Sequence, residues 1–250
     1  MQIVKLGGSV ITRKGGFEKA NSPALRALCK EIAYARKKSR EPLIIVHGAG
    51  SFGHPHVLKY KIRNGVRTPL QAQGFAKTHQ SVQKLSALVA SELMRAGVPC
   101  ASIPPLAIVR TKNKKITEFC TDAIDSLLSL GITPVLYGDV VIDDALGGCV
   151  LSGDAIISAL AKKARRLVLF TNVDGIYAGK ALVREINSKN APSILMHVGN
   201  SNHADVTGGM RGKLLELLKA KKPAFIANGS KPHVVRNVLL GKNAVCTRIN

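Results

Sequence analysis

Two glycine-rich segments of the sequence have the composition of phosphate-binding turns. HGAGSFGH, at His47–His54, follows an apolar run that begins at Leu43, contains three β-branched residues and predicts a buried strand. KLGGS, at Lys5–Ser9, ends a second short apolar run that begins at Gln2. Glycine lets the backbone approach a ligand closely, and a helix that starts at such a turn offers free N–H groups to an anion. If the two strands are neighbours in a parallel sheet, the two turns lie side by side and can hold two phosphate groups.

The spacing of the second segment also fits the dinucleotide fingerprint G-x-G-x-x-G, at Gly48, Gly50 and Gly53. That fingerprint needs an acidic residue roughly 20 positions further on to bind a ribose hydroxyl. Between Glu41 and Glu92 the chain carries no Asp or Glu, and no G-x-x-x-x-G-K-[ST] sequence occurs anywhere. The sequence therefore predicts a phosphate site of another kind.

The charge of the chain is strongly positive, which points to an anionic partner. The 250 residues carry a formal net charge of +22, and the basic residues are spread along the chain rather than gathered in a tail. Such an excess is typical of proteins that bind nucleic acids or acidic surfaces. With six Phe, four Tyr and no Trp, stacking platforms for bases are scarce. We interpret most of the charge as solvated helix faces and expect a small anionic substrate, not a nucleic acid, as the partner.

The cysteines and the hydrophobic runs favour a cytoplasmic protein that does not enter a membrane. The five cysteines form no C-x-x-C pair, and an odd number cannot all be paired in disulfides, which is typical of reduced thiols in the cytosol. No apolar run approaches the roughly 18 residues of a transmembrane helix. The first residues, MQIVKLGGS, lack the apolar stretch of a signal peptide.

Strand-like and helix-like patterns alternate along the chain, which predicts one α/β domain, residues 1–250, with a mainly parallel sheet covered on both faces. The segments His56–Pro69 and Ala178–Val206 show no regular pattern. Strands are expected at Gln2–Leu6, Leu43–His47, Ala101–Ile103, Ala107–Arg110, twice within Ile132–Asp143, and at Leu167–Thr171, Ala224–Ala227 and Val245–Arg248. Helices are expected at Ser22–Lys38, Leu70–Arg95, Thr121–Leu130, Ala155–Ala164, Met210–Ala220 and Lys231–Leu240.

Several short motifs are weak signals one by one and informative in their order and spacing. They are KLGGS at Lys5–Ser9, HGAGSFGH at His47–His54, YGDV at Tyr137–Val140, SGD at Ser152–Asp154, NVDGIY at Asn172–Tyr177, and VTGG at Val206–Gly209 followed by Lys213. Together they resemble the amino-acid kinase superfamily over essentially the whole chain. Within it, the SFGH ending and ITRK at Ile11–Lys14 most resemble the isopentenyl phosphate kinases.

The resemblance implies a three-layer αβα sandwich that transfers a phosphoryl group from ATP to isopentenyl phosphate. It implies ATP and Mg²⁺ as cofactors, a homodimer, an acceptor-binding part at about residues 1–150 and a nucleotide-binding part at about residues 151–250. The chemistry is plausible because a phosphate monoester has a second pKa of about 6, so its attacking oxygen is already anionic near neutral pH. Catalysis then consists of positioning two polyanions and neutralising their charge.

The resemblance also implies roles for single residues. Lys5 would contact the transferred phosphoryl group, and Lys14 and Lys213 would complete the cationic set. Asp154 would hold lysines in place by charge pairing. The alternative role of Asp154 is that of an ordinary carboxylate at a helix N-terminus. His54 would donate a hydrogen bond to the acceptor phosphate, whereas His47 fits a buried structural role at the strand end.

The remaining expected contacts fall into two groups. The backbone of Ala49, Gly50 and Gly153 would bind the acceptor phosphate, and the apolar candidates for its hydrocarbon tail are Phe75, Val82, Val150 and Ile156. The nucleotide contacts implied by the resemblance are Lys5, Leu6, Gly7, Gly8, Ser9, Gly50, Asp174, Tyr177, Gly179, Lys180, Gly208 and Lys213.

Two alternatives stay open at this level. A kinase of the same superfamily that phosphorylates a phosphonate such as fosfomycin would use the same His54. A catalytically inactive nucleic-acid-binding or regulatory protein on this fold would explain the positive charge, although the intact set of lysines and aspartate argues against it.

Overall fold

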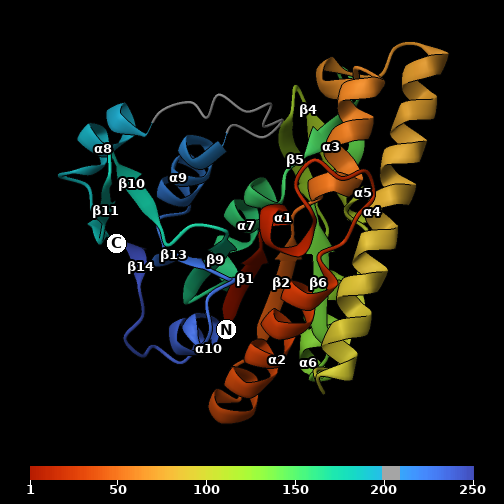
Figure 1. Ribbon diagram of the computed structural model, residues 1–250. Coiled ribbons are helices and arrows are strands. Elements are labelled where there is room, and N and C mark those ends of the chain that lie inside the picture. The colour runs from red at the N-terminus through yellow and green to blue at the C-terminus, as the bar shows by residue number, and fades with distance from the viewer. Residues whose placement is uncertain (199–208) are drawn as a thin grey trace.

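The computed structural model describes residues 1–198 and 209–250 and is built around an eight-stranded sheet (Figure 1). The strand order is β12-β14-β13-β9-β1-β2-β6-β3, so β1 and β2 are neighbours inside the sheet. The pairings in this sheet are parallel except for β13 with β14, which confirms the mainly parallel sheet. Its strands are β1 (Gln2–Leu6), β2 (Leu43–His47), β3 (Cys100–Ser102), β6 (Thr133–Tyr137), β9 (Arg166–Thr171), β12 (Glu185–Ile186), β13 (Ala224–Asn228) and β14 (Cys246–Ile249).

The central strands are apolar along their length because helices cover both faces of the sheet. Every residue of β1, β2 and β9 is buried. Successive side chains point to opposite faces, so Ile3 and Ile44 belong to one hydrophobic cluster and Val4 and Ile45 to the other. Helices that contribute to the first cluster are α6 (Asp122–Ser129), α7 (Gly153–Leu160), α8 (Ala191–His197) and α9 (Gly209–Ala220). Those of the second are α1 (Gly8–Ile11), α2 (Ser22–Ser39), α3 (Gly50–Lys59), α4 (Pro69–Arg95) and α10 (Val234–Leu239).

A second, four-stranded sheet with the order β5-β4-β7-β8 adjoins the first. The predicted strand at Ala107–Arg110 is wrong in its first half, because α5 (Pro105–Ile108) occupies that part of the chain. The two strands predicted within Ile132–Asp143 are confirmed as β6 and β7, and at Gly138 the chain passes from the main sheet into the second. The strands of this sheet are β4 (Val109–Lys112), β5 (Lys115–Phe119), β7 (Asp139–Asp143) and β8 (Gly147–Leu151).

Both segments expected to be irregular contain regular structure. Helix α3 continues to Lys59 despite Pro55 inside it, because Phe52 and Val57 bury their side chains, and a 3₁₀ turn at Ile62–Asn64 follows. Within Ala178–Val206, the described part up to residue 198 holds β12 and α8, and a hairpin of β10 (Ile176–Ala178) and β11 (Ala181–Val183). In the part of the chain that the structure describes, no helix combines the length and apolarity needed to span a bilayer.

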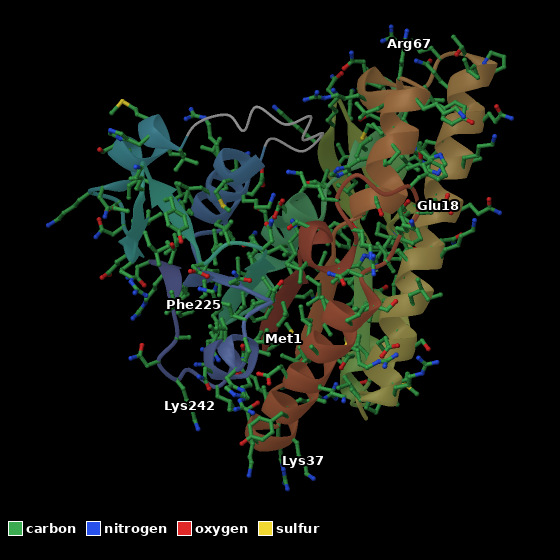
Figure 2. The ribbon with its side chains drawn as sticks, in the orientation of Figure 1. Met1, Glu18, Lys37, Arg67, Phe225 and Lys242 are labelled. Atoms are coloured by element: carbon green, nitrogen blue, oxygen red, sulfur yellow. The ribbon has the colours of Figure 1, made fainter. Side chains whose placement is uncertain are left out.

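Lysines near the end of α2 and after α10 extend into solvent. Figure 2 shows Lys37 at the far end of α2 and Lys242 beneath α10, both extending away from the ribbon. Both side chains are exposed, which agrees with the interpretation of much of the charge as solvated surface.

Asp143 connects the two hairpins of the second sheet. Its carboxylate is buried and accepts N–H bonds from Asn113 (3.1 Å), Lys114 (2.7 Å), and Ala145 and Leu146 (both 3.0 Å). Burial acts to raise the pKa of this carboxyl, but these N–H groups and the Thr111 hydroxyl outweigh it, so the pKa lies below its usual range. Ionised Asp143 therefore stabilises the fold.

Replacing Asp143 by Ala is expected to lower the free energy of unfolding by about 2 kcal/mol at pH 7, because hydrogen bonds to a charged group are lost. The folded-state pKa is depressed, so this contribution is present above the unfolded pKa near 4 and is lost as pH falls through the lower folded pKa. Urea unfolding of both proteins at pH 7 and at pH 3 measures the difference, which should shrink at pH 3. The neighbouring exposed Asp144, changed to Ala, is the control, and an equal loss for both variants would contradict the role of Asp143.

Candidate active site

The two glycine turns lie in direct contact at the carboxyl ends of β1 and β2. The N–H of Gly48 donates to the carbonyl of Leu6 over 2.9 Å, which continues the strand pairing into the turn. A Cβ on Gly8 would lie 2.7 Å from the nitrogen of Gly50, and a Cβ on Gly48 would lie 2.7 Å from the nitrogen of Gly8. The expectation that the two turns lie side by side is confirmed, and only glycine allows this approach.

Replacing Gly8 by Ala is expected to lower kcat by about 10²-fold, because pushing the turns apart by an ångström displaces two reacting groups. Steady-state kinetics measures kcat, and a thermal unfolding curve checks that the variant is folded. Gly97→Ala is the control: Gly97 follows α4 at a φ of 84° with open space around it, so this variant should lose stability and keep kcat. A Gly8→Ala enzyme with normal kcat would show that the turns do not bind the reacting phosphates.

A buried carboxylate holds two lysines beside these turns. Asp154, the second residue of α7, lies 2.5 Å from the Nζ of Lys5 and 3.8 Å from the Nζ of Lys213. Lys5 and Asp154 are each only 5% exposed, whereas Lys213 on α9 is half-buried. The expected charge pairing is therefore present in the structure, and it gathers cations from β1 and α9 around one helix start.

Backbone N–H groups from two helix starts converge near these cations. A Cβ on Gly138 would lie 3.3 Å from the nitrogen of Gly153 and 3.7 Å from that of Ala49. Gly153 is the first residue of α7, and Ala49 directly precedes α3. Both helices direct the positive end of their dipoles to this place. The structure thus brings together three predicted backbone contacts, Ala49, Gly50 and Gly153.

Two further candidates, His54 and Lys14, come from α3 and from the loop before α2. His54 lies in the second turn of α3 and is half-buried, and Lys14 is exposed. The loop that carries Lys14 is fixed on α3 by Glu18, which accepts from His56 over 2.9 Å, and by backbone bonds to Ser51. Figure 2 shows Glu18 next to α4, whose Lys84 also pairs with it over 3.3 Å.

His47 has the features of a structural residue. It is completely buried, its ring stacks on Tyr137 with 5.3 Å between the centroids, and its Nδ1 contacts the carbonyl of Gly48. Burial lowers the pKa of His47 to about 4, so the ring is neutral at pH 7 and adds no charge to the site.

Four of the expected nucleotide contacts, Asp174, Tyr177, Gly179 and Lys180, lie after the carboxyl end of β9 and along the β10–β11 hairpin. Asp174 accepts from Lys231 over 2.7 Å and from Asn228 over 3.1 Å, and these bonds hold its pKa below the usual range. Tyr177 is exposed on β10, and Gly179 and Lys180 form the hairpin turn, with Gly179 at a φ of 61°.

At the end of β1, the other expected nucleotide contacts differ in exposure: Leu6 is buried, whereas Ser9 in α1 (Gly8–Ile11) is exposed. The N–H of Gly7 donates to Phe170, and Gly208 lies outside the described residues.

The four apolar candidates for the acceptor tail lie in three different places. Phe75 and Val150, both partly buried, pack against one cluster formed by Val57, Tyr60, Ile62 and Val140. Val82 and Ile156 are completely buried, and they belong to the separate clusters on the two faces of the main sheet. The structure brings Phe75 and Val150 together and places the other two in the core.

Sequence reasoning missed some partners of these residues. Asn228 ends β13, the neighbour of β9, and Lys231 comes three residues later. Polar residues at the ends of adjacent parallel strands were a usable signal. His79 on α4 contacts Asp139, which belongs to the YGDV motif but had no role of its own. His79 comes four residues after Phe75 and three before Val82, on the same helical stripe.

Comparisons with known proteins give a consistent result. Residues 1–228 match the amino acid kinase family. Isopentenyl phosphate kinase of Methanothermobacter thermautotrophicus is 37% identical, with 100% of this chain and 98% of that protein aligned. Isopentenyl phosphate kinase of Methanocaldococcus jannaschii is 34% identical, with 97% and 96% aligned. Among solved structures, one described as X-ray structures of isopentenyl phosphate kinase superposes with a TM-score of 0.83 at 34% identity over 99% of both chains.

Proposed function

The chain belongs to the amino acid kinase family, and we propose that it phosphorylates isopentenyl phosphate with ATP, giving isopentenyl diphosphate and ADP. The proposal is supported by relatives of that activity that align over nearly their whole length at 34 and 37% identity. Neither a fosfomycin kinase nor an inactive nucleic-acid-binding protein is favoured by these similarities.

The observation that carries the proposal is the contact between the two glycine turns beside the Lys5–Asp154–Lys213 network. The acceptor phosphate is its own nucleophile, because an oxygen of the monoester is already anionic near neutral pH. The obstacle is repulsion between two polyanions. Buried cations and backbone N–H groups that are fixed before the substrates arrive lower this repulsion without a cost of reorganisation during the reaction.

We assign the residues as follows. Lys5, Lys14 and Lys213 neutralise the charge of the transferred phosphoryl group, and Asp154 positions Lys5 and Lys213. His54 and the N–H groups beside Ala49 and Gly153 bind the acceptor phosphate. The Gly7–Ser9 turn and the region of Asp174 to Lys180 bind ATP.

Magnesium fits this site through the phosphates of ATP. The carboxylate nearest the reacting groups, Asp154, is ion-paired with two lysines, and Mg²⁺ is commonly bound by nucleotide phosphates with few protein ligands. The ion would supply further charge neutralisation at the transferred phosphate. An acceptor-binding first part, a nucleotide-binding second part, a homodimer and a cytoplasmic location stay predictions of the resemblance, and sedimentation of the purified protein tests the dimer.

A phosphorylation assay against a panel of acceptors tests the proposed function. Purified protein is given ATP, Mg²⁺ and either isopentenyl phosphate, fosfomycin or a simple alkyl monophosphate, and the products are followed by ³¹P NMR. We expect isopentenyl phosphate to have the highest kcat/KM. Turnover of fosfomycin but not of isopentenyl phosphate would reject the proposal, and salt-dependent DNA binding with no turnover of any acceptor would reject enzymatic activity.

A further inference from the structure

An acid–base pair, buried Asp139 and half-buried His79, lies beside the candidate acceptor site without a role in the mechanism above. Nδ1 of His79 is 3.0 Å from both carboxylate oxygens of Asp139, whose side chain is 0% exposed. The N–H of Val140 donates to the same carboxylate over 2.8 Å. The hydrogen bond to Asp139 raises the pKa of His79, and burial raises the pKa of Asp139.

Fold stability alone is a weak reason for such a pair. Desolvating two charges costs several kcal/mol, and apolar residues of similar volume often serve stability as well or better. The ring of His79 is 19% exposed, so part of it reaches solvent. When the ring carries a proton on each nitrogen, Nδ1 donates to Asp139 and Nε2 on the opposite edge is a second donor.

The position of His79 along α4 indicates what this donor meets. Phe75, His79 and Val82 follow one stripe of the helix, with His79 about 6 Å beyond Phe75 and about 4.5 Å before Val82 at 1.5 Å per residue. Phe75 packs against the apolar cluster with Val150. Val82 is next to Gly53, because a Cβ on Gly53 would lie 3.3 Å from its Cγ1, and Gly53 directly precedes His54.

Strand β7, which carries Asp139, shows the same order, with a phosphate-binding region followed by an apolar region. Asp139 directly follows Gly138, where the N–H groups of Ala49 and Gly153 converge. The next residue, Val140, belongs to the apolar cluster that Phe75 and Val150 pack against. The pair therefore lies at the boundary between a phosphate-binding region and an apolar region.

In a prenyl monophosphate, the atom at that boundary is the ester oxygen that joins carbon to phosphorus. We propose that His79, positioned by Asp139, donates a hydrogen bond from Nε2 to the ester oxygen of the acceptor and so selects phosphate monoesters over phosphonates, in which carbon replaces this oxygen. This inference rests on the proposed function and adds a specificity-determining residue to it.

The test compares two ligands that differ only at this atom. Isothermal titration calorimetry measures the dissociation constants of isopentenyl phosphate and of its methylene phosphonate for each full-length variant. His79→Asn is the critical variant, because its amide N–H occupies nearly the place of Nδ1 and keeps the bond to Asp139, whereas the donor at Nε2 is lost. His79→Gln retains a donor near Nε2. Gln80→Asn, at an exposed position on the same helix, is the matched control.

We expect the preference for the ester, expressed as the ratio of the two dissociation constants, to fall by about tenfold in His79→Asn. It should stay near the wild-type value in His79→Gln and in Gln80→Asn. Equal weakening of the binding of both ligands in His79→Asn would show a merely structural role. Two unchanged dissociation constants would show no role. Either result overturns the inference. Wild-type protein that neither binds nor phosphorylates isopentenyl phosphate would instead reject the proposed function.

Discussion

Replacing Lys5 by Met is expected to lower kcat by about 10³-fold, at the upper end of what loss of one preorganised group at a transition state costs. Lys5 is the most buried of the three lysines and lies against the start of α7, with its Cε 3.4 Å from the place of a Cβ on Gly153. Methionine keeps the length of the side chain and removes the charge. The KM for ATP should change much less than kcat, because the charge is needed most when the phosphoryl group is in transit.

The Lys5→Met change removes the lysine that lies closer to Asp154, whereas Lys213, at 3.8 Å, is kept. Removing one member of a buried pair can cost about 3–5 kcal/mol of stability, so thermal unfolding must show that the variant is folded at the assay temperature. The Lys5→Arg variant keeps a positive charge beside Asp154 but places it differently. We expect this variant to be folded and to have a low kcat. Lys219→Met, exposed on α9, is the control. A folded Lys5→Met enzyme with normal kcat would place the reacting phosphates elsewhere.

The second large effect is expected for His54→Ala, which should lower kcat/KM for the acceptor by about 10²-fold, because a hydrogen bond to a charged group is lost where the acceptor phosphate must be aligned. ATP binding should stay nearly unchanged, because His54 lies on α3 and not among the proposed ATP contacts. Acceptor and ATP dissociation constants, measured with steady-state rates, separate the two effects.

His197→Ala is the matched control for this prediction. His197 is exposed on α8, and its ring contacts the carbonyl of Ser193 within the same helix. The control should keep normal rates for both substrates. If His54→Ala weakened ATP instead of the acceptor, the assignment of the two phosphate positions would be reversed.

The elements that could be predicted are those whose burial leaves a clear pattern. Strands β1, β2 and β9 are covered on both faces and appear in the sequence as short continuous apolar runs. In the second sheet, β7 and part of β4 were predicted, whereas β5 and β8 were missed: β5 reads KITEF, with no buried residue. Its hairpins depend on Asp143, which collects its donors from up to 32 residues away, and such contacts leave no local periodicity.

The same distinction applies to the candidate site. Lys5, Asp154 and Lys213 could be singled out because each belongs to a short motif at the end of a strand or the start of a helix. Val82 and Ile156 show the limit of periodicity, since a buried residue of the core and a residue of a binding pocket give the same helical spacing. The contact of His79 with Asp139 joins residues 60 positions apart, and only the packing of α4 on β7 brings them together.

The measurement that tests the central claim most directly is a crystal structure with a non-hydrolysable ATP analogue and isopentenyl phosphate bound together. We expect the terminal phosphate of the analogue beside Lys5 and Lys213, and the acceptor phosphate beside His54 and the N–H groups of Ala49 and Gly153. The two phosphates should face each other across the contact of the glycine turns. Both ligands bound at another face of the sheet, with these turns empty, would contradict the account.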